Sequence, residues 1–203
     1  MKTYGLVVTA MLLISACGGS AKVTQQKKEK KAPEPISGQK AFFRIYSQAR
    51  LSWAQDLQGF KLEPVPLASV KEHDGLWPAW RAILVSESKR SMRAYSYSVV
   101  AAEGIHEGIF AGPEESYTGP RGQNLPFNIA GFRTDSPEAI EIAKKNSEKY
   151  IKKFPDVPIT VMLEKTKELP DPAWRVIWGT SAQASNYSVY VDAATGQYMK
   201  TMR

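Results

Sequence analysis

The chain has 203 residues, of which 43% are hydrophobic and 23% are charged, and its formal net charge is +7. One cysteine and two histidines exclude an intramolecular disulfide and leave few side chains for a transition-metal site. Residues 17–38 carry a net charge of +3 and the remainder from Gln39 carries only +3, so the charge is not gathered into one nucleic-acid-binding domain and we expect no nucleic-acid partner.

The first predicted element is a short apolar run that follows Lys2. The run Tyr4–Ala16 has no charge and is too short to span a bilayer as a helix, which is typical of a secretory signal. It ends in Ile-Ser-Ala-Cys, which resembles the lipobox of bacterial lipoproteins. The resemblance implies a signal peptide over residues 1–16 and lipid, palmitate included, on Cys17. Gly18 in the next position implies sorting to the outer membrane of a Gram-negative cell. An ordinary signal peptide followed by an unmodified cysteine is the alternative.

The next segment, residues 17–38, has five lysines, two prolines and almost no apolar residues. Such a composition cannot bury enough apolar surface to fold, so it predicts a flexible basic tether. We expect this tether to separate the folded part from the membrane and to be mildly attracted to anionic headgroups.

The folded remainder contains a repeated motif. Pro-Ala-Trp-Arg occurs at Pro78–Arg81 and again at Pro172–Arg175, and Tyr-Ser-Val recurs at Tyr97 and Tyr187. The motif copies keep their order, and their offsets are 94 and 90 residues. We infer an internal duplication, with a first repeat over residues 39–126 and a second over residues 127–203.

The first repeat predicts one helix and three or four strands. Apolar residues recur at helical spacing from Phe42 to Leu57. The strand Phe60–Val70 contains Pro64 and Pro66, which favours an edge or irregular position. Strands follow in the Pro-Ala-Trp-Arg segment, after Tyr95, and in residues 101–110.

The second repeat shows the pattern more clearly. Helical spacing runs from Ala139 to Phe154, with Ser136 as the expected N-cap and Pro137 at the first helical position. Apolar residues alternate in the strand Val157–Lys167, and strands are expected at the second Pro-Ala-Trp-Arg, at Tyr187 and at residues 198–202. The fold class is therefore α+β, with each repeat a helix packed on a small antiparallel sheet.

The helix "EAIEIAKK", the strand "WRV" and the hairpin "YSVYVDAATGQYM" together resemble the PepSY domain, over about residues 136–202. The first half resembles it less, because "AAEGIHEG" replaces the Asp-x-x-Thr-Gly turn. The resemblance implies a cystatin-like α+β unit in a secreted or envelope protein, with a role in binding or inhibiting proteases.

Candidate catalytic chemistry is sparse. His73 and His106 lie in expected turns with no second ligand at metal-binding spacing, so we expect solvated histidines, no metal and no cofactor. No nucleophile motif is present, and we expect no enzyme. The alternative is a hydrolase accessory using the expected loop 112–128, where Glu114 and Glu115 could form an acid/base couple.

Strand alternation divides the aromatic and charged residues between two faces. Trp80 and Trp174 are expected in the core, with carbohydrate stacking as the alternative. The opposite face carries the candidate partner-binding residues, namely Arg81, Ile83, Arg175, Ile177 and Tyr190. These residues form either an exposed binding surface or the seam between the two repeats.

The sequence thus predicts a non-catalytic lipoprotein of the outer membrane, facing the periplasm or the cell surface. Its expected partners are the membrane, through the lipid on Cys17, and another envelope protein or an envelope polymer. A structural subunit of an envelope complex is the alternative.

Overall fold

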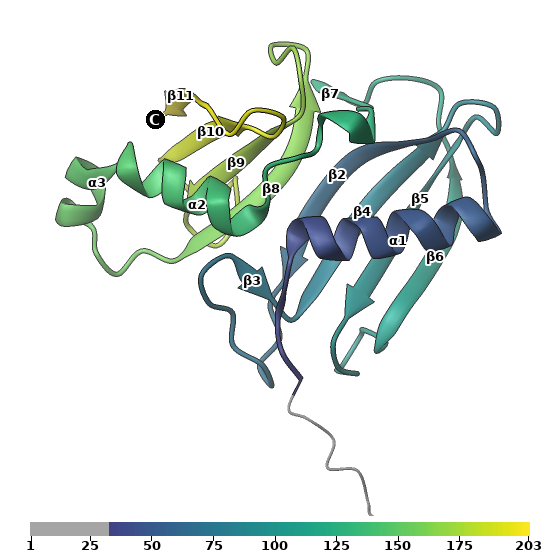
Figure 1. Cartoon of the computed structure of the whole chain (residues 1–203), viewed down its shortest axis with the longest axis horizontal. Coiled ribbons are helices and arrows are strands. Elements are labelled where there is room, and N and C mark those ends of the chain that lie inside the picture. The colour runs from purple at the N-terminus through teal and green to yellow at the C-terminus, as the bar shows by residue number, and fades with distance from the viewer. Residues whose placement is uncertain (1–32) are drawn as a thin grey trace, which may run out of the picture. The chain divides into compact units, whose positions relative to one another are not determined.

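The computed structural model describes residues 33–203 (Figure 1), so the predicted signal, Cys17 and most of the predicted tether lie outside the described residues. The last residues assigned to the tether, Ile36–Gly38, form a short strand and the first residue of a helix. In chain order the described elements are β1 (Ile36–Ser37), α1 (Gly38–Ser52), β2 (Leu57–Val65), β3 (Leu76–Trp77), β4 (Ala79–Ser86), β5 (Ser91–Ser98), β6 (Gly108–Ser116), β7 (Asn124–Leu125), a 3-10 turn (Ile129–Gly131), α2 (Ser136–Lys145), α3 (Glu148–Lys153), β8 (Ile159–Thr166), β9 (Ala173–Trp178), β10 (Ser188–Asp192) and β11 (Tyr198–Met202).

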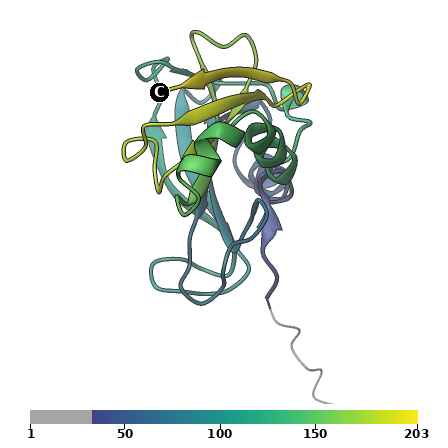
Figure 2. The same cartoon turned by 90° about the vertical axis from the view of Figure 1, so that its left-hand side faces the viewer.

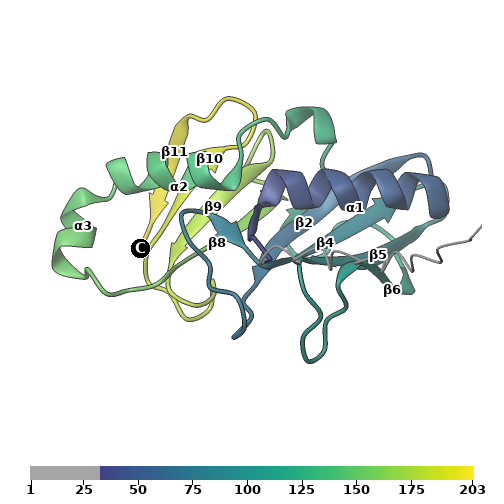
Figure 3. The ribbon, with the colours of Figure 1, turned by 60° about the horizontal axis from the view of Figure 1, so that its bottom comes forward.

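One antiparallel sheet joins the two halves of the described chain. Its strands follow the order β11-β10-β9-β8-β2-β4-β5-β6, while β7 pairs with β8 beside this row and β1 pairs separately with β3. The helices lie on one face of the sheet (Figures 2 and 3). The α+β class is confirmed at this level. The prediction of two small sheets is wrong, because β2 and β8 pair at Lys61↔Glu164 and Leu62↔Leu163 and join the strands into one sheet.

The two halves have the same element order on either side of the β2–β8 pair. A helix comes first in each half, and the next four long strands run outward from the centre in sequence order. The tryptophans of the repeated motif make matching contacts: the Trp80 indole N–H donates to the Ile36 carbonyl and that of Trp174 to the Thr134 carbonyl, each at 2.9 Å. Each acceptor lies two residues before a helix begins, so the motif fixes the start of the helix in its own half.

The second repeated motif does not occupy matching places. Trp80 lies opposite Tyr97 across β4 and β5, whereas Trp174 lies opposite Val191 across β9 and β10. Matching Tyr97 with Tyr187 is therefore wrong, and Val191 holds the equivalent position. Tyr187 precedes β10 and stacks on Tyr150 of α3, with 3.9 Å between the ring centroids.

The main core lies between the helices and the sheet and is shared by both halves. Trp80 and Trp174 are fully buried and meet edge to face, with 6.3 Å between ring centroids, so the predicted core role is confirmed. Phe42 of α1 contacts Phe127 and Phe132, at centroid distances of 6.3 and 5.4 Å. Each half therefore completes the core of the other.

The N-termini of α1 and α2 meet over this core. The backbone N–H of Gly38 donates to Ser136 Oγ and that of Gln39 to Asp135 Oδ1, both at 2.9 Å. Asp135, rather than the predicted Ser136, is the N-cap of α2, because its carboxylate accepts the Ser136 N–H at 2.7 Å. The Ser136 hydroxyl instead donates to the Gly75 carbonyl at 2.7 Å and so ties the helix start to the loop before β3.

The helix predicted over residues 139–154 is interrupted. α2 ends at Lys145, and α3 begins at Glu148. The Asn146 side-chain amide donates to the Ile142 carbonyl at 2.8 Å, which completes the last turn of α2 from a side chain. After this interruption, α3 lies at the end of the molecule beyond β9 and β10 (Figure 1).

The strand β2 is central, so an edge position is wrong, whereas the predicted irregularity is present as a register shift between Gly59 and Lys61 in its pairing with β4. The expectation rested on Pro64 and Pro66, which cannot donate to a neighbouring strand. However, β8 pairs with β2 only at Lys61 and Leu62, and Pro64 lies beyond this short contact. Pro66 follows the last residue of the strand. The prolines are thus placed where no donor to β8 is needed.

Candidate binding surface on the helix-free sheet face

The five predicted partner-binding residues lie on the sheet face that no helix covers. Trp174 and Val176 belong to the core beneath the helices, so Arg175 and Ile177 point to the other face. The register Tyr190↔Arg175 places Tyr190 beside Arg175 on that face. Arg81 and Ile83 of β4 share the face, on the other side of β2 and β8.

The structure brings only some of these residues into a common site. Arg175 and Ile177 line a groove of about 340 Å³ that extends across β9, β8 and β2 to Asn124 of β7 and to the β9–β10 connection at residues 180–183. Arg81 is exposed outside the groove, and Ile83 packs with a separate cluster around Phe60 and Val85. The groove is lined by Lys61, Glu63, Pro64, Asn124, Thr160, Val161, Met162, Glu164, Arg175, Ile177, Thr180, Ser181, Ala182 and Gln183.

The sequence analysis offered two forms for this face, an exposed binding surface or the seam between the repeats, and the structure matches neither in full. The face is not evenly exposed, because Ile177 is 1% and Tyr190 5% exposed. Tyr190 packs with Leu169, which lies outside the expected strands, and with Met199 of β11. The face is not a seam either, because the halves join edge to edge through β2 and β8. Of the candidate residues, the half-buried Arg175 is the one that brings a charge into the groove.

The Arg175 guanidinium is held from one side only. Its Nε donates to Ser188 Oγ at 3.1 Å, and its carbon lies 5.8 Å from the centroid of the Tyr190 ring. Its two terminal nitrogens make no hydrogen bond within residues 33–203. The guanidinium fork can therefore receive a carboxylate or a carbonyl of a ligand.

Glu164 supplies the opposite charge at the same groove. It is 5% exposed, and its Oε1 accepts the Tyr190 hydroxyl at 2.8 Å. Burial, and after it the charge of Glu164, raises the pKa of Tyr190, which therefore remains a neutral donor. No hydrogen bond to Glu164 Oε2 occurs among the described residues, so this oxygen remains an acceptor for a ligand. Lys61 and Glu63, which also line the groove, form an ion pair in which Lys61 Nζ lies 2.6 Å from Glu63 Oε2.

The groove is suited to recognition. Its lining combines the apolar side chains of Ile177 and Met162 with two cationic and two anionic residues, of which Lys61 and Glu63 pair with each other. The two histidines are exposed in turns outside it, as expected. Within residues 33–203, no cluster of histidine, cysteine, aspartate and glutamate side chains could hold a metal ion.

The alternative site in residues 112–128 does not have the expected form. Gly112–Ser116 belong to β6, and Phe127 is buried. Glu114 accepts hydrogen bonds from Ser91 at 2.6 Å and Trp53 at 3.1 Å, and the Ser91 bond is the main cause of its lowered pKa. Glu115 pairs with Arg121 at 3.5 Å. Since adjacent strand residues point to opposite faces, the two carboxylates cannot act as a couple, and that prediction is wrong.

Several groove residues were missed by the sequence analysis. Thr160, Met162 and Glu164 alternate with the core residues Val161 and Leu163 of β8, so alternation alone could have placed them on the helix-free face. The groove wall formed by residues 180–183 could not be predicted in this way, because the β9–β10 connection has no alternation of apolar and polar residues.

Comparisons with known proteins show no family for this chain. No family model matches the chain, and no curated protein matches it. Among solved structures, it is similar to the crystal structure of a putative lipoprotein (CD1622) from Clostridium difficile 630. The TM-score is 0.49 and the identity 10%, over 83% of this chain and 93% of that chain. A likeness this distant carries no argument about function, and the PepSY resemblance stays a prediction.

None of the helices in residues 33–203 has both the length and the apolar character needed to cross a bilayer.

Proposed function

We propose that the chain is a non-catalytic, lipid-anchored protein of the cell envelope that binds a segment of another envelope protein in the groove of the helix-free face. The observation that carries the proposal is the arrangement of Arg175, Tyr190 and Glu164. A half-buried cation and a buried carboxylate share one groove, and each has polar atoms that no described residue uses. Burying such groups is favourable only when a ligand completes their hydrogen bonds.

A protein segment suits the groove better than an envelope polysaccharide. A peptide offers carbonyls and carboxylates to Arg175, N–H groups to Glu164, and apolar side chains to Ile177 and Met162. Arginine and methionine are enriched in protein interfaces. An anionic polysaccharide would gain no net attraction, because Lys61 and Arg175 are balanced by Glu63 and Glu164 in the groove lining.

The proposed location is the outer membrane, facing the periplasm or the cell surface, with the lipid on Cys17. The lipobox-like Ile-Ser-Ala-Cys supports this, and Cys17 is the only cysteine. We further propose that the two halves are PepSY-like repeats and that the partner is a protease or its regulator. The common element order of the halves and the matching contacts of Trp80 and Trp174 support the repeat.

The proposal is tested by crosslinking and capturing the whole chain from the producing bacterium in three forms. Arg175→Glu places a negative charge in the groove, and Arg81→Glu makes the same change on the same face outside it. We expect Arg175→Glu to lose at least one envelope protein that wild type and Arg81→Glu both retain. Arg175→Gln removes the positive charge without adding a negative one and should lose the same protein, which separates the loss of recognition from misfolding caused by a buried negative charge.

Identical captured proteins for all forms would refute binding in the groove. A protease or protease regulator among the lost proteins would support the regulatory role, and several subunits of one assembly would support the structural alternative instead.

A further inference from the structure

The positive charge of the folded chain is concentrated at one end. Residues 144–153 contain five lysines and one glutamate, a net charge of +4. The whole chain from Gln39 carries +3, so the rest of that part is slightly negative. These residues span the end of α2 and all of α3, at the end of the molecule away from β6 (Figure 1).

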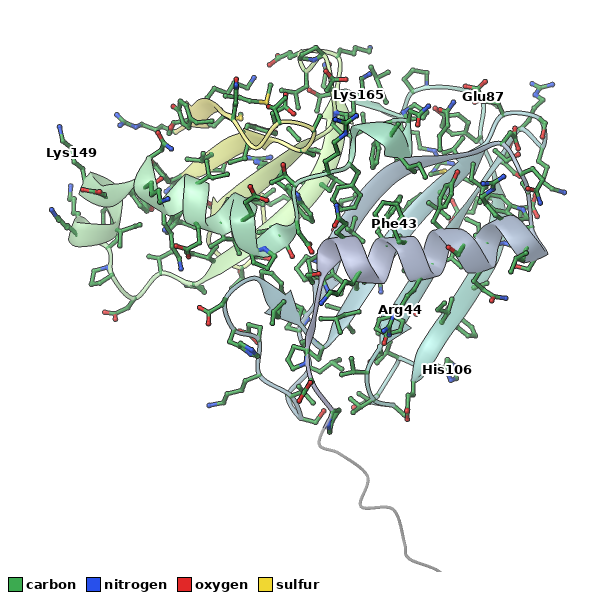
Figure 4. All side chains as sticks on the ribbon, in the orientation of Figure 1. Phe43, Arg44, Glu87, His106, Lys149 and Lys165 are labelled. Atoms are coloured by element: carbon green, nitrogen blue, oxygen red, sulfur yellow. The ribbon has the colours of Figure 1, made fainter. Side chains whose placement is uncertain are left out.

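The lysines of this segment are available to a ligand. Lys144 pairs with Glu141 at 3.0 Å. Lys145, Lys149, Lys152 and Lys153 are exposed and form no ion pair within the described residues. Figure 4 shows Lys149 extending outward from α3. Their charge is therefore not neutralised inside the protein.

An exposed aromatic ring lies among these lysines. Phe154 follows α3 and is 41% exposed. The Nζ of Lys153 lies 5.3 Å from the centroid of its ring, and the Tyr150 ring lies 4.9 Å away. Together with Lys145, Lys149, Lys153 and Tyr150, Phe154 lines an open basin of about 780 Å³.

We propose that Lys145, Lys149, Lys152, Lys153 and Phe154, the α3 basic patch, form a second binding surface that rests on an anionic phospholipid layer. Charge complementarity requires an anionic occupant. Lysine is a flexible point charge that suits headgroups without fixed geometry, and an exposed aromatic ring adds the apolar contact that an interface accepts. This surface is independent of the groove, which lies on the helix-free face. It would orient the folded part on the membrane that carries the lipid anchor.

The test uses residues 33–203, which pack as one unit with their own core, so the lysines of residues 17–32 do not contribute. Binding is measured by co-sedimentation with vesicles of phosphatidylcholine alone or mixed equally with phosphatidylglycerol. We expect binding only to the mixed vesicles. Lys149→Glu with Lys153→Glu should weaken it at least about tenfold, since each lysine near an anionic surface contributes roughly fivefold.

The matched control is Lys71→Glu with Lys167→Glu, two exposed lysines outside the patch. It changes the net charge equally and should retain most of the binding. An equal loss in both double variants, or no binding to the mixed vesicles by wild type, would overturn the proposal.

Phe154→Ala separates a lipid surface from a soluble polyanion. We expect it to weaken binding to mixed vesicles and to leave binding to inorganic polyphosphate unchanged. If Phe154→Ala leaves vesicle binding unchanged while polyphosphate binds as tightly as vesicles do, the occupant is a soluble polyanion and the lipid proposal fails.

Discussion

At the scale of residues, the two motif tryptophans connect sequence to fold most directly. Their burial followed from strand alternation and from the repeated motif. Their hydrogen-bond acceptors could not be predicted, because Ile36 and Thr134 lie 44 and 40 residues away in sequence. Similarly, alternation assigned Ile177 and Tyr190 to the correct face but could not show that both are nearly fully buried there.

Trp80→Phe and Trp174→Phe should each lower the free energy of unfolding by about 1–3 kcal/mol, because each leaves a backbone carbonyl without its donor and removes part of a core ring. Trp53→Phe is the control, since its indole bonds Glu114 at an exposed site. Chemical denaturation measures all three. A loss at Trp53 as large as at Trp80 and Trp174 would contradict the role assigned to the motif.

Asp56 provides a prediction about pH. The Ser86 hydroxyl, donating at 2.7 Å, and the Ser88 N–H, donating at 2.8 Å, lower the pKa of Asp56 to about 2 from its usual 3.8. A lowered pKa in the folded state stabilises the fold above the usual value, and the contribution disappears as pH falls through 2. The melting temperature of Asp56→Asn should therefore lie below that of wild type near neutral pH and approach it in acid. A difference that does not change with pH would refute this.

At the scale of elements, periodicity placed most helices and strands, and the errors have local physical causes. The prolines suggested an edge position for β2, but its contact with β8 is only two residue pairs long and does not include them. The break between α2 and α3 was missed because the apolar spacing continues through it, while the Asn146 side chain completes the end of α2.

The start of α1 supplies a test at this scale. A Cβ on Gly38 would lie 2.7 Å from the Trp174 ring and 2.9 Å from the Trp80 ring. Gly38→Ala should lower stability by about 1–3 kcal/mol through overpacking, although alanine is the better helix former. Lys40→Ala, at an exposed position in the same turn, should be nearly neutral. Stabilisation by Gly38→Ala would show that the two rings are not packed against the helix start.

At the scale of the whole molecule, the duplication inferred from sequence predicted two units, each with its own sheet, whereas in residues 33–203 one main sheet and one main core serve both halves. Sequence periodicity cannot distinguish two separate sheets from one shared sheet, because both arrangements bury the same faces of the same helices. Only the contacts between the halves, such as the Trp80–Trp174 and Phe42–Phe127 pairs, show that the two halves share one core.

The second half alone, residues 127–203, should therefore not fold. Without the first half it exposes the inner edge of β8 and the rings of Phe127, Phe132 and Trp174. Thermal unfolding followed by circular dichroism should show no cooperative transition for this half and a single one for residues 33–203. A cooperative transition in the isolated half would mean that the halves are independent domains.

The central claim is that the groove of the helix-free face binds an envelope protein, and photocrosslinking in intact cells tests it most directly. A photoreactive amino acid replaces Gln183, exposed at the groove wall, or Leu51, 83% exposed on α1 over the opposite face. The account predicts a discrete crosslinked protein from position 183 that is absent from position 51 and that Arg175→Glu abolishes. A product from position 51 alone, or one from position 183 that is unaffected by Arg175→Glu, would contradict it.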